Sequence, residues 1–342
     1  MLTNTINNLI SGLDSRRQEV INDRFGLNGG KIQTLEKLGS RHGITRERVR
    51  QIESEALNRL RERIDEKDES YKKIVFSINN HLRNNGGLRR DDIFSNEIKS
   101  ILKDEKLNHW HLRLFSEISG EIFYYPRNDY FHQFWYLDEN DISLLKKFLS
   151  ELERTIANKR AQLINEGNFH SHLFLIVKRH GISDTMGINY VSVSKKFGIN
   201  PFGDFGLSHW EEISPKTVRE KSYLVLKKIG KPMHFREISE SINKNGFDGK
   251  KALPQTVHNE LIKDKNIILV GRGVYALKEH GYLPGTTREV IKQILKQKGP
   301  MPSRKLIENV LKQRILKENT ILINLHNKNY FKRLSDGKYR LA

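Results

Sequence analysis

Apolar residues recur at helical spacing over residues 35–63, and a short polar turn divides them into two runs. Thr34 and Thr45 precede the two runs and carry side chains that commonly cap helix N-termini. Gly43 suits the turn because glycine adopts positive φ without strain, and Gly39 suits a close crossing of two helices. The apolar side chains expected between the helices and along the second one are Leu38, Ile44, Val49, Ile52, Ala56, Leu57 and Leu60. The pattern predicts a helix-turn-helix.

The remainder of the chain alternates helical stretches with short β-rich runs and turns. The last two segments each read as three helices followed by a hairpin, with a Gly-x-Gly or an Asp-Gly turn. An earlier segment begins with helical spacing and ends in two β-rich runs, which indicates a divergent winged helix. We therefore expect a mainly α fold with small β-hairpin wings, built from tandem helix-turn-helix and winged-helix modules. The expected modules are the helix-turn-helix at 1–66, the divergent winged helix at 70–138, a helical connector and mixed module at 139–215, and winged helices at 216–282 and 285–342.

Charge and cysteine content narrow the class of protein. Lysine and arginine outnumber the acids 60 to 41, so the 342-residue chain has a formal net charge of +19. A chain this basic favours a polyanionic partner, nucleic acid above all, over the alternative of a merely basic soluble protein. The absence of cysteine removes disulfides, cysteine-bound zinc and thiol nucleophiles. No apolar run nears the roughly 18 residues that span a bilayer, and no signal-peptide pattern is found. We expect a cytoplasmic, nucleoid-associated protein without membrane contact.

The second helix of the predicted helix-turn-helix carries its chemistry on the face opposite the apolar stripe. That face holds Arg46, Glu47, Arg48, Arg50 and Gln51. In a helix-turn-helix, residues near the start of the second helix meet base edges in the major groove. Arginine can bond guanine there, glutamine adenine, and glutamate cytosine. The alternative is a solvated charged helix face, but the coincidence of cap, glycine spacing and charge favours duplex DNA.

Four stretches of this region resemble region 4 of the sigma-70 family of transcription initiation factors, at residues 13–21, 24–27, 34–39 and 45–53. The last of them, Thr-Arg-Glu-Arg-Val-Arg-Gln-Ile-Glu, is the most specific. The resemblance, which covers about residues 10–65, implies recognition of the −35 promoter element and docking on the β-flap of the bacterial RNA polymerase core. It also implies base contacts at Arg46, Glu47 and Gln51, and contacts to phosphate or beside the bases at Arg16, Thr45, Arg48 and Arg50.

The chain departs from that family in two respects. Family members commonly have a basic residue where this chain has Glu55, and again at Asn58. In addition, nothing in the chain resembles region 2, the aromatic-rich helix that melts the −10 element. The chain is therefore not a recognisable complete initiation factor.

The later modules show weaker signals. Residues 218–282 resemble the HARE-HTH domain of the polymerase δ subunit, through 231–238, 254–261 and 271–277. Pro254 fits the first position of a helix. Contacts to DNA or to protein are expected on that helix and in the two wings at Gln255, His258, Lys263, Arg272, Lys332 and Arg333. A basic wing commonly binds phosphate, and a solvated hairpin is the alternative.

Other chemistry finds little support in the sequence. Residues 26–31 lack the spacing of a P-loop, and the acids at 91–92 lie too close to 97–99 for a nuclease motif. The histidine pairs 109/111 and 170/172 would point apart on a helix, which argues against a metal site. We expect no enzymatic activity, no cofactor, no metal and no small-molecule substrate. Three functions stay open: a sigma-like transcription protein, an operator-binding regulator, and a DNA-targeting subunit of a defence or restriction system.

Overall fold

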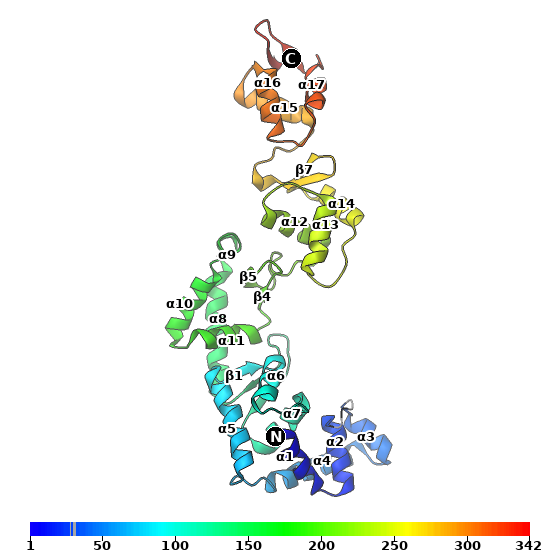
Figure 1. Ribbon diagram of the computed structural model, residues 1–342, viewed down its shortest axis with the longest axis vertical. Coiled ribbons are helices and arrows are strands. Elements are labelled where there is room, and N and C mark those ends of the chain that lie inside the picture. The colour runs from blue at the N-terminus through cyan, green and yellow to red at the C-terminus, as the bar shows by residue number, and fades with distance from the viewer. Residues whose placement is uncertain (28, 30–31) are drawn as a thin grey trace. The chain divides into compact units, whose positions relative to one another are not determined.

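The computed structural model describes residues 1–27, 29 and 32–342, so residues 26–31, which lack the spacing of a P-loop, lie partly outside the described residues. The chain divides into two compact units, Met1–Phe197 and Gly198–Ala342, which are described separately. Both are mainly helical and contain small antiparallel sheets, as the sequence predicted (Figure 1). None of the described helices combines the length and apolar character needed to cross a membrane.

The first unit begins with four helices, α1 (Leu2–Ser11), α2 (Ser15–Phe25), α3 (Leu35–His42) and α4 (Arg46–Glu62). Both predicted caps are present: the hydroxyls of Thr34 and Thr45 accept the backbone N–H groups of Lys37 and Arg48, each at 3.2 Å. Gly43 has φ of 63° at the turn, which confirms its expected role. A small core packs α2 against α3 and α4, and it contains Val20, Leu38, Val49 and Ile52. The predicted helix-turn-helix is confirmed.

Three later segments share one order of elements and one strand order. The first consists of α5 (Glu69–Asn84), β1 (Leu88–Arg90), α6 (Asp91–Ile101), α7 (His109–Ser119), β2 (Phe123–Tyr125) and β3 (Phe134–Tyr136). The second consists of α12 (Val218–Ile229), β6 (Met233–His234), α13 (Phe235–Asn245), α14 (Pro254–Lys263), β7 (Ile267–Gly271) and β8 (Val274–Leu277), followed by the short helix η1 (Lys278–His280). The third consists of α15 (Thr287–Lys298), β9 (Met301–Pro302), α16 (Ser303–Leu311), α17 (Glu318–Leu325), β10 (Phe331–Arg333) and β11 (Lys338–Leu341).

In each of these segments the last strand lies in the middle of a three-stranded antiparallel sheet. The two hairpins of the second unit were expected from the sequence. The short first strand of each sheet was not, because two or three residues carry too little of the alternating pattern to be recognised.

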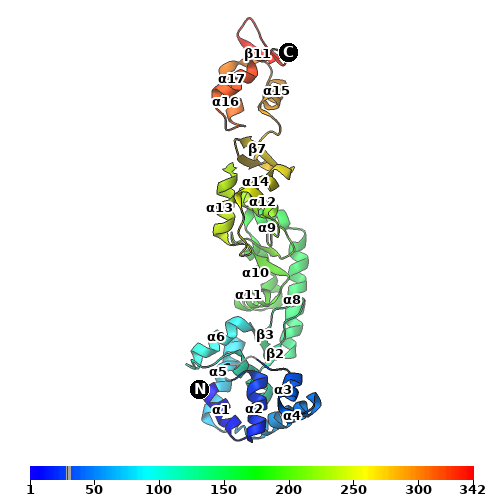
Figure 2. The same cartoon turned by 90° about the vertical axis from the view of Figure 1, so that its right-hand side faces the viewer.

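A helical bundle completes the first unit. It contains α8 (Glu139–Ala157), α9 (Arg160–Glu166), α10 (Phe169–His180) and α11 (Asp184–Val193), and the strands β4 (Phe197–Ile199) and β5 (Phe205–Leu207) follow it. Figure 2 shows α8 running alongside α10 and α11. Phe148 and Tyr190 meet edge to face in this core, with ring centroids 5.5 Å apart.

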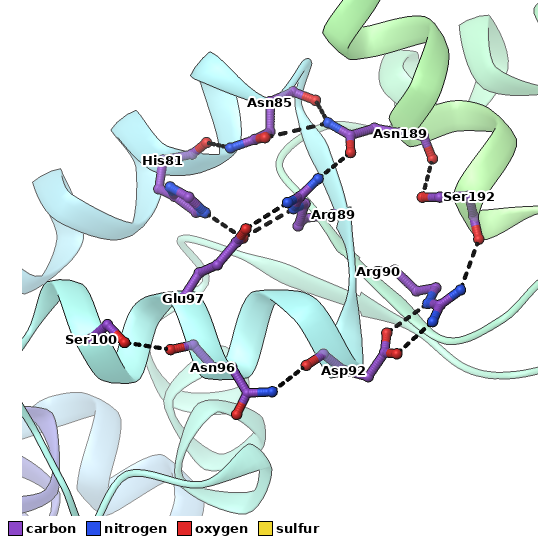
Figure 3. A network of polar contacts seen from close by, with 10 residues as sticks. All are labelled: His81, Asn85, Arg89, Arg90, Asp92, Asn96, Glu97, Ser100, Asn189 and Ser192. Atoms are coloured by element: carbon purple, nitrogen blue, oxygen red, sulfur yellow. Dashed lines mark hydrogen bonds and ion pairs between the residues drawn. The ribbon is translucent and has the colours of Figure 1, made fainter.

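A polar network joins α11 to the winged segment of the first unit (Figure 3). The Arg89 guanidinium donates to both Glu97 and Asn189, and Asn189 Nδ2 donates to Asn85 O at 2.8 Å. Close by, His132 N donates to Val193 O at 2.8 Å, in the manner of a strand pair. The winged segment and the end of the bundle are therefore held together by buried and half-buried polar contacts.

Candidate nucleic-acid interface

The first turns of α4 present a charged face to solvent. Arg46, Glu47, Arg48, Arg50 and Gln51 are all exposed. Behind them Val49 is 0% exposed and Ile52 is 4% exposed, and both lie in the core shared with α2 and α3. The helix is thus buttressed from behind while its polar side chains project outwards, as expected for a helix that enters a groove.

Most side chains of this face are paired with one another. Arg50 Nη2 lies 2.7 Å from Glu47 Oε1, and Arg48 Nη1 donates to Gln51 Oε1 at 3.0 Å. The hydrogen bond from Arg50 holds the pKa of Glu47 below its ordinary value. Arg46, in contrast, has no ion-pair partner within 4 Å among the described residues. Exposed pairs of this kind contribute little, about 0–1 kcal/mol, so DNA groups can replace them at small cost.

The position of this face depends on how closely α3 approaches α4. A Cβ atom built on Gly39 would lie 2.7 Å from Ile44 O, so only glycine fits here. Around the approach lies a shallow open depression, lined by Glu36, Gly39, Ser40, Gly43, Ile44, Thr45, Arg46 and Arg48. Arg16, expected to contact phosphate, is exposed on α2.

Glu55, which departs from the common family pattern, has a specific partner. Its carboxylate accepts from Arg17 Nη2 on α2, and it lies 4.0 Å from Arg48 Nη1. The hydrogen bond from Arg17 lowers the pKa of Glu55. Arg17 also pairs with Asp14, the N-cap of α2. Sequence reasoning missed this contact because the partners are 38 positions apart.

The residues expected to make contacts in the second unit differ in exposure. Gln255, Lys263, Arg272, Lys332 and Arg333 are exposed. Lys263 pairs with Glu260 at 2.8 Å.

His258, where contacts to DNA or protein were also expected, is not exposed like the other five. His258 is half-buried, its Nδ1 lies 2.9 Å from the Tyr275 hydroxyl, and its ring centroid is 4.7 Å from that of Phe235. The His258 side chain is therefore part of the aromatic core of the segment. The sequence did not reveal this packing because the neighbours of His258 come from a preceding helix and a following strand.

The acids that faintly suggested a nuclease have structural partners. Asp91 is buried and accepts from Trp135 Nε1 at 2.7 Å, and His109 Nδ1 lies 2.7 Å away. Burial acts to raise the pKa of Asp91, but the hydrogen bonds from His109, Trp135 and Gln133, together with the charge of His109, outweigh it and leave the pKa below its ordinary value. His111 contacts Asn108 instead, so the two histidines do point apart. No cluster of three metal-ligating residues occurs in the part of the chain that the structure describes.

Comparison with known proteins gives the helix-turn-helix a family. Residues 9–62 match the model of sigma-70, region 4. The chain is also 38% identical over 65 residues to the chloroplastic RNA polymerase sigma factor sigF of Arabidopsis thaliana. That alignment covers 19% of this chain and 12% of the relative. The resemblance of residues 218–282 to HARE-HTH domains stays a prediction. Residues 9–62 thus form a sigma-70 region 4 domain, and the match supports a sigma-factor-like DNA-binding role.

Proposed function

We propose that this chain is a sigma-factor-like transcription protein that binds −35-type promoter DNA through α4 and contacts bacterial RNA polymerase. The observation that carries the proposal is the exposed polar face of α4 above a buried apolar stripe. The region 4 match at residues 9–62 supports it. Because the alignment with the chloroplastic sigma factor covers only a small part of both proteins, the activity and partners of the whole chain are part of this proposal.

In this reading α4 lies in the major groove. Arg46, Glu47 and Gln51 meet base edges, where their donors and acceptors complement guanine, cytosine and adenine respectively. Three cations and one hydroxyl hold the phosphates or lie beside the bases. The cations are Arg16, Arg48 and Arg50, and the hydroxyl is that of Thr45. Phosphate contacts fix the position of the helix but carry no sequence information by themselves.

The remaining modules extend this interaction. We assign residues 218–282 to a HARE-HTH-like winged helix and residues 285–342 to a second winged helix, which contact flanking DNA or polymerase. The chain acts by binding, without catalysis or a cofactor, and it works at the nucleoid in the cytoplasm. The structural partners of Asp91 and Glu97 are consistent with a role in folding for these acids.

Genome-wide mapping of the DNA bound by the full chain tests this function directly. The proposal expects enrichment at promoters, in register with the −35 element. It also expects capture of core RNA polymerase, and weaker capture of polymerase that lacks the β-flap. Bound operators without polymerase capture would instead identify a classical regulator. Co-purification with a nuclease or a methylase would identify a subunit of a defence or restriction system.

Arg46→Ala is the sharpest test of the site. Loss of a contact to guanine should cost about 1–3 kcal/mol of binding and relax base preference at one position. The matched control is Arg59→Ala, which removes the same charge from the exposed side of α4 roughly 20 Å further along the helix. Footprinting and selection from a random DNA pool measure both effects. An unchanged base preference in the Arg46 variant would overturn the assignment.

A further inference from the structure

The excess positive charge of the chain is concentrated in the last 127 residues of the sequence, outside the region 4 domain. Residues 216–342 contain 28 lysines and arginines against 11 acids, whereas residues 1–215 contain 32 against 30. The last module, residues 285–342, contains 14 against 4, and the region 4 module, residues 1–66, only 12 against 10. Salt-dependent affinity for DNA comes from cations that displace condensed counterions. The nearly neutral region 4 module is therefore poorly equipped to supply that affinity.

Two cations of the last module face each other on its wing. In the register of β10 and β11, Lys332 lies directly opposite Arg340, and both are exposed. Neither has an acidic partner within 4 Å in the described parts of the chain. Like charges directly opposite one another destabilise an antiparallel pair. A bound anion between or above them removes that repulsion.

Two more cations from α15 reach the same part of the wing. Ala342 N donates to Tyr330 O at 3.0 Å, which extends the ladder, and Phe331 is buried. Side chains alternate along a strand, so Tyr330 and Lys332 share the exposed face. The Arg288 guanidinium lies 4.5 Å from the Tyr330 ring centroid, and Lys292 Nζ lies 4.1 Å from it.

We name Arg288, Lys292, Lys332 and Arg340 the C-terminal basic surface. Arg288 Nε is buried and has no hydrogen-bond partner among the described residues. Glu289 interacts electrostatically with Arg288 and Lys292. Its carboxylate also accepts a hydrogen bond from Thr286 N at 2.6 Å, in the capping box of α15. Its charge is therefore shared with the start of the helix. The surface as a whole keeps an excess of positive charge.

The helix before the wing has a different composition. α17 begins with the exposed acid Glu318 and otherwise exposes uncharged side chains, Asn319, Thr320 and Ile323. Amides and hydroxyls bond base edges, and apolar groups contact thymine methyls, whereas cations bind phosphates. A helix without cations, followed by a cationic wing, fits the grooves and backbone of duplex DNA better than it fits a lipid surface, which would need cations on the helix as well.

We propose that the C-terminal basic surface binds the phosphate backbone of duplex DNA independently of sequence and supplies much of the salt-dependent affinity of the chain. α4 then supplies selectivity, and the last module supplies attachment. The choice of duplex DNA rests on the function proposed for α4, since both belong to one chain. The charge distribution and the wing geometry do not depend on it.

Binding of the full chain to a labelled duplex of arbitrary sequence, over a series of salt concentrations, tests the proposal. For Lys332→Ala with Arg340→Ala we expect the slope of log affinity against log salt to fall by about 2. At about 0.1 M salt the affinity should drop by about 10- to 100-fold. The control is Arg304→Ala with Lys305→Ala, two exposed cations on α16 outside the surface. Thermal unfolding checks that both variants remain folded.

The outcomes separate the hypotheses. An unchanged slope in the wing variant, or an equal change in the α16 control, overturns the proposal. So does loss of binding to phosphatidylserine vesicles with DNA binding intact, which would assign the surface to lipid. If the wing variant lowers the slope while Arg46→Ala leaves base preference unchanged, the function proposed for α4 fails and the basic surface stands.

Discussion

At the scale of single residues, the candidate reading face is largely neutralised by acids of its own domain. Glu47 pairs with Arg50, and Glu55 pairs with Arg17 and lies near Arg48. These contacts are exposed, so they add little to stability. Their main effect is electrostatic, because each carboxylate reduces the attraction of a neighbouring arginine for phosphate. Arg46 has no ion-pair partner within 4 Å among the described residues, so it can bind DNA without breaking such a pair.

Glu55→Lys should raise the affinity of the chain for duplex DNA. The change removes a carboxylate 4.0 Å from Arg48 and adds a cation, so about one more phosphate can be neutralised. We expect a gain of about threefold to tenfold at about 0.1 M salt, measured by fluorescence anisotropy. Glu62→Lys, at the far end of α4, makes the same change of charge at an exposed position. Equal gains in the two variants would contradict a local effect.

At the scale of elements, the corner between α3 and α4 determines where the reading face lies. Thr45 caps α4, and Gly43 closes the turn in the left-handed conformation. Gly39 permits the close approach of the two helices. These features act within a dozen residues, which is why the corner was recognisable from the sequence.

Gly39→Ala should loosen this corner. Its new Cβ atom would lie 2.7 Å from the backbone oxygen of Ile44, and that oxygen can move only if the helices separate. The expected cost is about 1–3 kcal/mol. Hydrogen exchange should show this loss of stability as faster exchange of the α3 and α4 amides in the variant than in the natural sequence. Gly43→Asn is the control, since asparagine tolerates the left-handed conformation and a Cβ there meets nothing within 4 Å. Unchanged protection in the Gly39 variant would show that the close approach is dispensable.

At the scale of the whole molecule, the two units carry different properties. The first unit contains the region 4 domain and the polar network of Figure 3. It also contains three histidines, His111, His132 and His172, whose pKa values burial lowers. The second unit contains most of the excess positive charge. Recognition of bases and attachment to the backbone are thus assigned to different parts of the chain.

These three histidines, two buried and one half-buried, predict that the first unit loses stability below neutral pH. Their pKa values in the folded chain lie below the ordinary value of 6.5, so the unfolded chain takes up protons first. The stabilisation is complete above pH 6.5 and declines as the pH falls towards the folded-state values. Calorimetry between pH 7 and pH 5 should show a falling transition temperature for this unit, and His111→Gln should flatten the decline.

The control for this prediction is His209→Gln, which replaces an exposed histidine of the second unit. It should leave the pH dependence of the first unit as it is in the natural sequence. A transition temperature that is independent of pH over this range, or an equal flattening in both variants, would contradict the burial argument.

Short-range features of the sequence determined the helix-turn-helix and the hairpins of the second unit. Caps, turn glycines and apolar spacing predicted the helix-turn-helix, and turn residues predicted the hairpins of the second unit, because each signal acts over a few neighbouring positions. The motif at residues 45–53 likewise indicated the family of the first domain.

Only the tertiary structure decided which distant side chains meet. Glu55 holds Arg17, Arg89 reaches Asn189, and His258 packs on Tyr275 instead of facing solvent. The pairing of Lys332 with Arg340 across the wing also depends on strand register. These contacts join positions that become neighbours only when separate elements pack, and neither periodicity nor capping specifies that packing.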